Sequence, residues 1–283
     1  MRAHPHLVLA AALALGAGAS AQPRDIGAAA VSDAASLRLR YHAGTTARFT
    51  TRTVQTSGAA GAATRSTTTA TVQIETLAVT PGGDAQQRMR FERMVIENPA
   101  LTAQIRERIT RALSGATIEY TQSPRGEITA RSAASGVPDE LRPVIDAMMQ
   151  SLDQMGPQLP ERPVRVGERW SERRTMHLAP LPGTSVDMRY ETEFTLRALR
   201  PDGAAVLGLA VTLSTPEGAS IAGIPFRGEG SATGETVIDL ARGVVRESRT
   251  SGEMGVHLTV RGRTVDVPSR FENEMRLAPQ RAR

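Results

Sequence analysis

Polar and apolar residues alternate along much of this chain, and a period of two residues restricts those stretches to β-strands. In the stretches 187–196 and 264–277, apolar residues fall on one face while charged residues fall on the other. This alternation is typical of antiparallel strands that cover a core with one face and meet water with the other. The segments Pro81–Gly83 and Pro201–Gly203 join such stretches and are typical of hairpin turns. We therefore expect a mainly β protein of about ten antiparallel strands.

Two helices are expected near the middle of the chain. The first follows Asn98 and Pro99, because asparagine caps helices well and proline suits the first helical position. The second should run over 139–155, where apolar residues recur at helical spacing until Gly156 ends the pattern. We expect a strongly curved antiparallel sheet, or an incomplete barrel, whose concave face is covered by the second helix.

The two halves of the chain resemble each other, which suggests a duplicated unit. When position 71 is laid on position 191, an offset of 191 − 71 = 120, Pro81 meets Pro201. The pseudo-repeats would cover about 37–132 and 165–277, with the second helix between them, inside a single β-rich domain over 37–277. Hairpins in general contain proline and glycine, so chance similarity is the alternative explanation.

The first 21 residues are expected to be a cleavable signal peptide. A positive charge near the start precedes the apolar run 7–17, and Ala19–Ala21 matches the small-x-small cleavage pattern. The Ala-rich segment 22–36 is expected to be a flexible tether, and 278–283 a tail. No later stretch approaches the roughly 20 apolar residues that a membrane span needs. We therefore expect an exported protein, periplasmic or secreted, without a transmembrane segment.

Absent residue types exclude several chemistries. The chain has no cysteine, which excludes disulfides, thiol catalysis and iron–sulfur clusters. All 34 basic residues are arginine, so lysine-dependent phosphate loops and Schiff bases are excluded too. A GC-rich genome or a function for guanidinium groups would each explain that bias. The formal net charge of +5 is spread among 29 acidic residues and aromatics make up 3%, which argues against nucleic-acid binding. A weak attraction to anionic envelope surfaces remains open.

The polar motifs favour structure over chemistry. The glycine-rich segment 228–234 has no lysine and no helical pattern after it, so we interpret it as a bulged or kinked strand. Glu191 and Glu193 share a strand face with basic residues, which is typical of a solvated surface. The histidines beyond the leader lack the spacing of a metal site; they are His42, His177 and His257. We expect no catalytic residues, no metal and no cofactor.

The most specific motif is LPERPVRVGERW, from Leu159 to Trp170. It resembles the signature L-P-x-x-P-V-x-V-G-[DE]-x-W of an uncharacterised family of secreted bacterial β-rich proteins. The order of strands, central helix and strands over 37–277 is also similar to that family. The resemblance implies a fold and no catalytic residues. The expected architecture also looks like that of the Lol-type lipoprotein carriers. We interpret Trp170 mainly as a core residue that opens the second sheet.

The methionines suggest a ligand. Met fills irregular space and adapts to varied partners, so a Met-lined helix is suited either to core packing or to a lipid-accommodating cavity. The candidate ligand-binding residues lie on the second helix and beside it in the sheet: Met148, Met149, Leu152, Met155 and Trp170. The first hypothesis is a non-catalytic carrier for an apolar, lipid-like ligand. The alternative is an envelope scaffold with a filled core that binds another protein through strand edges. Hydrolase activity is a third and less favoured hypothesis.

Overall fold

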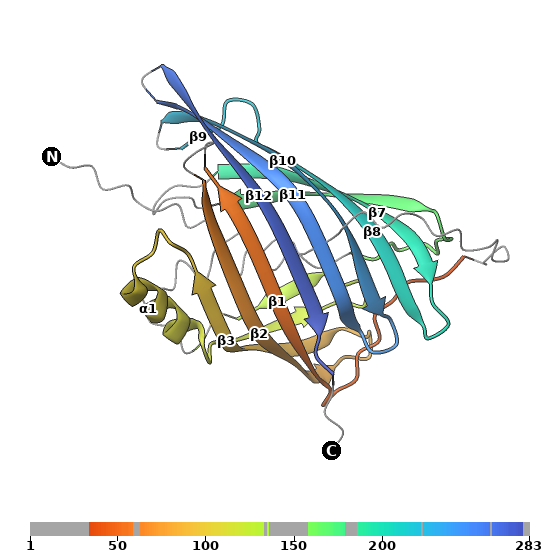
Figure 1. Ribbon diagram of the computed structural model, residues 1–283. Helices are drawn as coiled ribbons and strands as arrows, with labels where there is room; N and C mark the ends of the chain where they lie inside the picture. The colour runs from red at the N-terminus through yellow and green to blue at the C-terminus, as the bar shows by residue number, and fades with distance from the viewer. Residues whose placement is uncertain are drawn as a thin grey trace.

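One antiparallel sheet of twelve strands makes up this protein, in the order β5-β4-β3-β2-β1-β12-β11-β10-β8-β7-β6, with β9 paired to β10 beside that path. The computed structural model describes residues 34–58, 63–132, 135, 158–178, 186–221, 223–260 and 262–279. The strands are β1 (Thr46–Ser57), β2 (Thr64–Val79), β3 (Ala85–Glu97), β4 (Thr117–Gln122), β5 (Ile128–Arg131), β6 (Arg169–Leu178), β7 (Val186–Leu199), β8 (Ala204–Ser214), β9 (Ser220–Ile221), β10 (Ile224–Asp239), β11 (Val244–Val260) and β12 (Arg263–Leu277). The helix α1 (Ala103–Leu113) lies beside β3 (Figure 1).

The expected fold class is confirmed at the level of one curved antiparallel sheet, but the details differ. The strand count exceeds about ten partly because β9 has only two residues, too few to leave a sequence pattern. The glycine-rich segment 228–234 is continuous strand within β10, and the bulge falls between Val237 and Ile238 instead. Strand β6, which contains Trp170, joins the same sheet and does not open a second one. The second expected helix, 139–155, lies outside the described residues.

Helix α1 begins later than the sequence predicts. Asn98 forms a turn, in which its side chain accepts a hydrogen bond from the Ala100 amide at 2.9 Å. The N-cap is Thr102, whose hydroxyl accepts from the Ile105 amide. Thr102 replaces Asn98 as the cap because its backbone is extended and its oxygen reaches the first free amides. Ile105 is 46% exposed, while Ile109 and Leu113 are buried.

The two faces of the sheet differ in chemistry. One face, which we call the inner face, carries Phe49, Val72 and Phe91 at aligned register positions of β1, β2 and β3. The opposite, outer face carries cross-strand ion pairs such as Arg173–Glu191 at 3.0 Å and Arg197–Glu235 at 3.1 Å. Exposed ion pairs of this kind contribute little to stability, but they make this face of the sheet hydrophilic. The alternation read from the sequence therefore places the core on the inner face.

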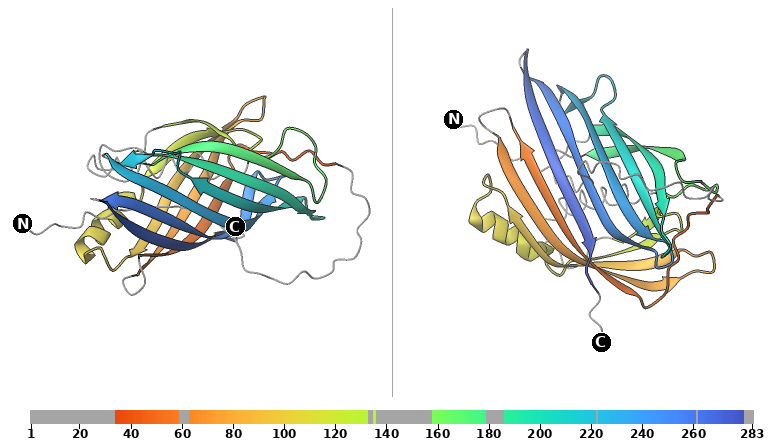
Figure 2. Two further views of the ribbon diagram at one scale, coloured as in Figure 1. Left: turned by 90° about the horizontal axis from the view of Figure 1, so that it is seen from above. Right: turned by 45° about the vertical axis from the view of Figure 1, so that its right-hand side comes forward.

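The inner face is concave. Ala85, on the β1–β5 half of the sheet, packs in one buried cluster with Leu207 and Leu196 on the other half. Side chains from distant strands can meet this way only if the sheet curls around its inner face, as Figure 2 shows. We call this cluster the floor; its buried members are Leu37, Leu39, Tyr41, Ala85, Leu159, Val164, Leu196, Ala205, Leu207 and Ile238. A second cluster lies where α1 covers the inner face of β2, β3 and β4.

The signature segment builds the floor. Leu159 and Val164 are fully buried there, and Val164 forms a two-way backbone bridge with Ala35 at 2.8 and 3.0 Å. Gly167 has a φ of +92°, which favours glycine, and its amide donates to the Leu196 carbonyl at 2.7 Å. The motif thus turns the chain from the floor into β6. Its residues are explained by folding alone.

The sheet does not close into a barrel in the described part of the chain. Strands β5 and β6 end the strand order and do not pair with each other. The described segments that precede them meet near the floor, where the Leu159 amide donates to the Arg125 carbonyl at 2.8 Å and Arg125 pairs with Glu161 at 2.7 Å. The structure is therefore an incomplete barrel with one end filled by the floor.

Candidate ligand-binding face

Above the floor, the inner face of β7, β8, β10 and β12 carries an apolar patch. Its centre is formed by Val211, Ala232 and Phe271, which are buried. Around it, Tyr190, Leu209 and Leu213 are only half-buried, unlike the fully buried leucines of the floor. We call these six residues the inner patch. Apolar surface that the fold leaves partly uncovered is the feature that a lipid-like ligand needs.

Glycine gives the inner patch its shape. A Cβ at Gly252 would lie 2.8 Å from a ring atom of Phe271, so the phenyl ring crosses β11 where that strand has no side chain. A Cβ at Gly230 would meet the Glu253 carbonyl oxygen at 2.8 Å. These glycines therefore let side-chain and backbone atoms of the neighbouring strands approach their backbone closely. The glycine-rich part of β10 has no room for large side chains.

An aromatic pair lies where the inner patch meets the β6 edge. Trp170 stacks on Phe194 with ring centroids 5.5 Å apart and an interplanar angle of 18°. The indole Nε1 donates to the Gln158 carbonyl at 2.9 Å, which fixes the ring against the segment before β6. Trp170 is half-buried and packs against the floor. Trp170 therefore lies between the floor and the inner patch.

A charged pair also lies on the inner face of β6. Glu172 and Arg174 are 2.9 Å apart, and their side chains are 15% and 19% exposed, far less than the ion pairs of the outer face. Burial raises the pKa of the Glu172 carboxyl, although the neighbouring Arg174 opposes that shift. Burial likewise raises the pKa of Tyr190, which lies close to both charges. This pair is the polar end of the candidate site, and the alternation pattern gave no sign of it because charged residues at these positions point inward.

Hydroxyl and amide groups line the inner face on the other side of the patch. Gln55 donates to the Ser269 hydroxyl at 3.0 Å, and Thr53 donates to the Asn273 side-chain oxygen at 3.3 Å. Next to them on β11, Thr250 is 2% exposed and its hydroxyl has no hydrogen-bond partner. The inner face is therefore apolar on β7 and β8 and neutral but polar around β1 and β12.

Only one of the five residues expected to bind ligand lies in the described part of the chain. Met148, Met149, Leu152 and Met155 lie outside the described residues, so only Trp170 of that set is placed. Among the strand methionines, Met89 and Met188 are 7% and 1% exposed, while Met275 is only half-buried. Sequence reasoning missed Glu172 and Arg174, and it did not single out Leu209 or Leu213. The alternation of β8 was the available signal for the two leucines.

Three further observations bear on chemistry. Within the described residues, no three His, Cys, Asp or Glu side chains come together in a way that would hold a metal ion. His257 lies on the outer face, 2.7 Å from Asp266 and 3.6 Å from Glu229. Within the described residues, no helix has both the length and the apolar character that a membrane crossing requires.

Comparisons with known proteins add little. No protein-family model matches the sequence, and no curated protein is similar to it. Among solved structures, the chain is similar to a lipovitellin structure that concerns lipid–protein interactions. The TM-score is 0.49 and the identity 12%, over 86% of this chain and 26% of that one. This chain therefore spans about a quarter of that protein's length, and a likeness this weak carries no functional argument.

Proposed function

We propose that this protein is an exported, non-catalytic carrier or binding module for an apolar, lipid-like ligand. The ligand would lie on the inner patch, between the aromatic pair of β6 and the polar stretch of β1 and β12. Export is inferred from the leader sequence alone. The absence of a catalytic role is inferred from residue types and spacing.

The observation that carries the proposal is the incomplete burial of the inner patch. The leucines of the floor are 0 to 8% exposed, whereas Leu209, Leu213 and Tyr190 on the same concave face are less completely buried. A protein that needed only a core would gain about 25 cal/mol for each Å² of apolar surface that it removed from water. The inner patch nevertheless stays partly uncovered, and it lies on the face opposite the charged outer face. A bound apolar ligand would cover it.

The test uses a neutral apolar fluorophore, N-phenyl-naphthylamine, and the only tryptophan of the chain. If the probe sits on the inner patch, it should accept excitation energy from Trp170. Leu213→Asp should abolish this transfer, because it places a charge on the patch. Thr212→Asp is the matched control, since Thr212 is the neighbouring exposed residue on the outer face. The control should bind the probe like the wild type.

Leu213→Ser gives a second variant if the aspartate variant fails to fold. It should weaken probe binding several-fold while circular dichroism shows the native spectrum. The proposal fails if the wild type binds no probe, or if Leu213→Ser and Thr212→Asp are both native and bind the probe equally.

The alternative function, an envelope scaffold, is favoured by one observation. Strand β6 has ten residues and ends the strand order, so one of its edges pairs with no other described strand. An open edge of this length can accept a strand from a partner protein. A pull-down from envelope extracts that depends on β6, together with no probe binding, would favour the scaffold over the carrier.

A further inference from the structure

Three strands extend past the rest of the sheet at the end opposite the floor. The pairing of β12 with β1 stops at Ser269, and that of β10 with β8 stops at Glu229. Beyond those points, among the described strands, β10, β11 and β12 pair with one another and with the short β9. We call this projection the tab; it consists of 224–228, 256–260 and 263–267. Figures 1 and 2 show its β11–β12 hairpin reaching past the neighbouring strands.

On one face of the tab, the side chains that the structure describes are hydrocarbon apart from one arginine at the end. The register places the apolar residues together on the continuation of the inner face: Phe226, Val256, Leu258, Val265 and Val267. Val265 is 49% exposed, and Ile224 at the base of the tab is 36% exposed. These are two of the four large apolar residues that are exposed in the described part of the chain, so the projection concentrates exposed apolar surface.

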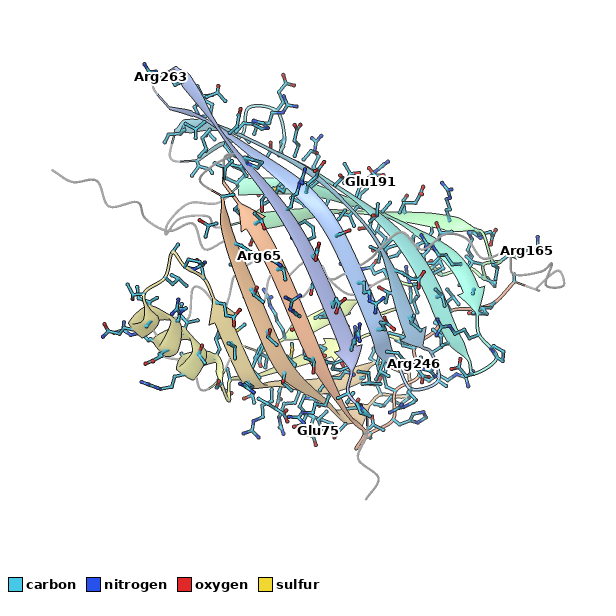
Figure 3. The ribbon with its side chains drawn as sticks, in the orientation of Figure 1. Arg65, Glu75, Arg165, Glu191, Arg246 and Arg263 are labelled. Atoms are coloured by element: carbon cyan, nitrogen blue, oxygen red, sulfur yellow. The ribbon has the colours of Figure 1, made fainter. Side chains whose placement is uncertain are left out.

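The charges of the tab are sorted between its faces. On the outer face, Arg227 pairs with Glu229 at 2.6 Å and His257 with Asp266 at 2.7 Å. Arg263 lies at the tip of the tab, on the same face of β12 as Val265. Figure 3 shows its side chain pointing away from the body of the protein. It is exposed and forms no ion pair with any described residue. Among the described residues of the three segments, the apolar face therefore carries one positive charge, that of Arg263, and no carboxylate, since Asp266 lies on the outer face.

We propose that the tab docks on the surface of an anionic phospholipid bilayer. Val265 and its apolar neighbours would enter the interfacial region, and Arg263 would contact lipid phosphates. Interfacial elements bind in this way, with apolar residues below the headgroups and basic side chains among them. A protein partner fits less well, because protein interfaces carry regular hydrogen bonds and the apolar residues of this face offer no side-chain donor or acceptor. This inference does not depend on the inner patch holding a ligand.

The experiment measures sedimentation of the exported protein with vesicles. One vesicle set contains equal parts of phosphatidylglycerol and phosphatidylcholine, and the other contains phosphatidylcholine alone. Wild type should bind the anionic vesicles more tightly than the neutral ones, with a difference that shrinks in high salt. Val265→Asp should weaken binding at least about tenfold, because it replaces a valine that inserts among the lipids with a charged side chain. Arg263→Gln should weaken binding about fivefold on the anionic vesicles only.

The matched control is Val166→Asp. Val166 is 45% exposed, close to the exposure of Val265, but it lies in the segment before β6. This variant should bind vesicles like the wild type. The proposal is overturned if Val265→Asp binds as tightly as the wild type, if Val166→Asp loses binding equally, or if the wild type binds neither vesicle. A dimer that Val265→Asp dissociates, without vesicle binding, would instead assign the tab to a second copy of the chain.

Discussion

The floor and the tab use the same residue types at opposite ends of one sheet, with opposite degrees of burial. In the floor, Leu196 and Leu207 are completely buried by chain segments that are far apart in sequence. In the tab, Val265 and Ile224 stay exposed because, among the described strands, β1 stops short of β12 there and the short β9 flanks β10. The difference teaches that the floor stabilises the fold, while the inner patch and tab keep apolar surface available. The predictions below test that division.

Alkaline pH should produce the largest effect. Burial raises the pKa of Tyr41 in the floor and of Tyr120 beneath α1, and Tyr190 is shifted the same way. These are all three tyrosines of the chain. Their contribution to stability is complete below the ordinary tyrosine pKa of 10.0 and is lost as pH rises above it toward the folded values. Arginine stays charged there, so tyrosine ionisation should dominate.

A combined pH titration checks this. Phenolate absorbance should lag behind the ordinary tyrosine curve and then rise together with the loss of the circular dichroism signal. Ionisation of any tyrosine at its ordinary pKa in a chain that remains folded would contradict the burial of these side chains.

Truncating the floor should be the most damaging substitution. Leu207→Ala should lower the free energy of unfolding by about 2 to 5 kcal/mol, because it leaves a cavity at a fully buried position. Val265→Ala in the tab should change it by less than about 0.5 kcal/mol. Urea denaturation measures both. Equal losses at the two sites would remove the distinction between floor and tab.

Disrupting a charge network beside the floor should have the next largest effect on stability. Asp239 is 2% exposed, accepts from Arg246 at 2.8 and 3.1 Å and from the Arg242 amide at 3.0 Å. Arg246 also bonds Asp202 and lies at the end of the molecule away from the tab (Figure 3). Arg246→Ala should cost about 2 to 3 kcal/mol, because it leaves a buried carboxylate without its cation.

The control for that network is Arg173→Ala. Arg173 pairs with Glu191 on the outer face, where its side chain is 80% exposed. Thermal melts should show no more than a small shift for this variant, since exposed pairs contribute roughly 0 to 1 kcal/mol. A loss as large as that of Arg246→Ala would show that the outer face also carries stability.

The smallest effect should come from Glu172→Gln. The raised pKa means that the folded protein prefers this carboxyl protonated, so its stabilising contribution is present below 4.5 and is lost as pH rises through the folded value. The glutamine variant should therefore be more stable than the wild type at neutral pH, by less than about 1 kcal/mol. Below the ordinary carboxyl pKa the two should be equal. A less stable variant at neutral pH would show that the pair with Arg174 outweighs its burial.

The sequence predicted what depends on local patterns. The inward positions of Met188 and Phe194 follow from alternation, and both are buried. The helix cap was misplaced because Asn98 can form a turn as readily as it caps, and only the backbone course selects Thr102. The curved sheet was expected from the sequence, but the floor was beyond local reasoning, since it joins Leu37 to Leu159 across about half of the domain.

The candidate site was harder to predict than the fold. Trp170 stood out because it is the only tryptophan, whereas the inner patch depends on strand registers that align β7, β8 and β12. The tab depends on strand lengths, because β11 and β12 outrun β1 and β8. Such differences arise from pairings between segments far apart in sequence. No period within one segment reveals them.

Native mass spectrometry of the protein purified after export tests the central claim most directly. The account predicts a population whose mass exceeds that of the chain by the mass of a lipid-sized molecule, which organic extraction releases. Leu213→Asp should lose this extra mass and Thr212→Asp should keep it. A wild-type spectrum that shows only the bare chain, from cells in which apolar ligands are plentiful, would contradict the carrier account.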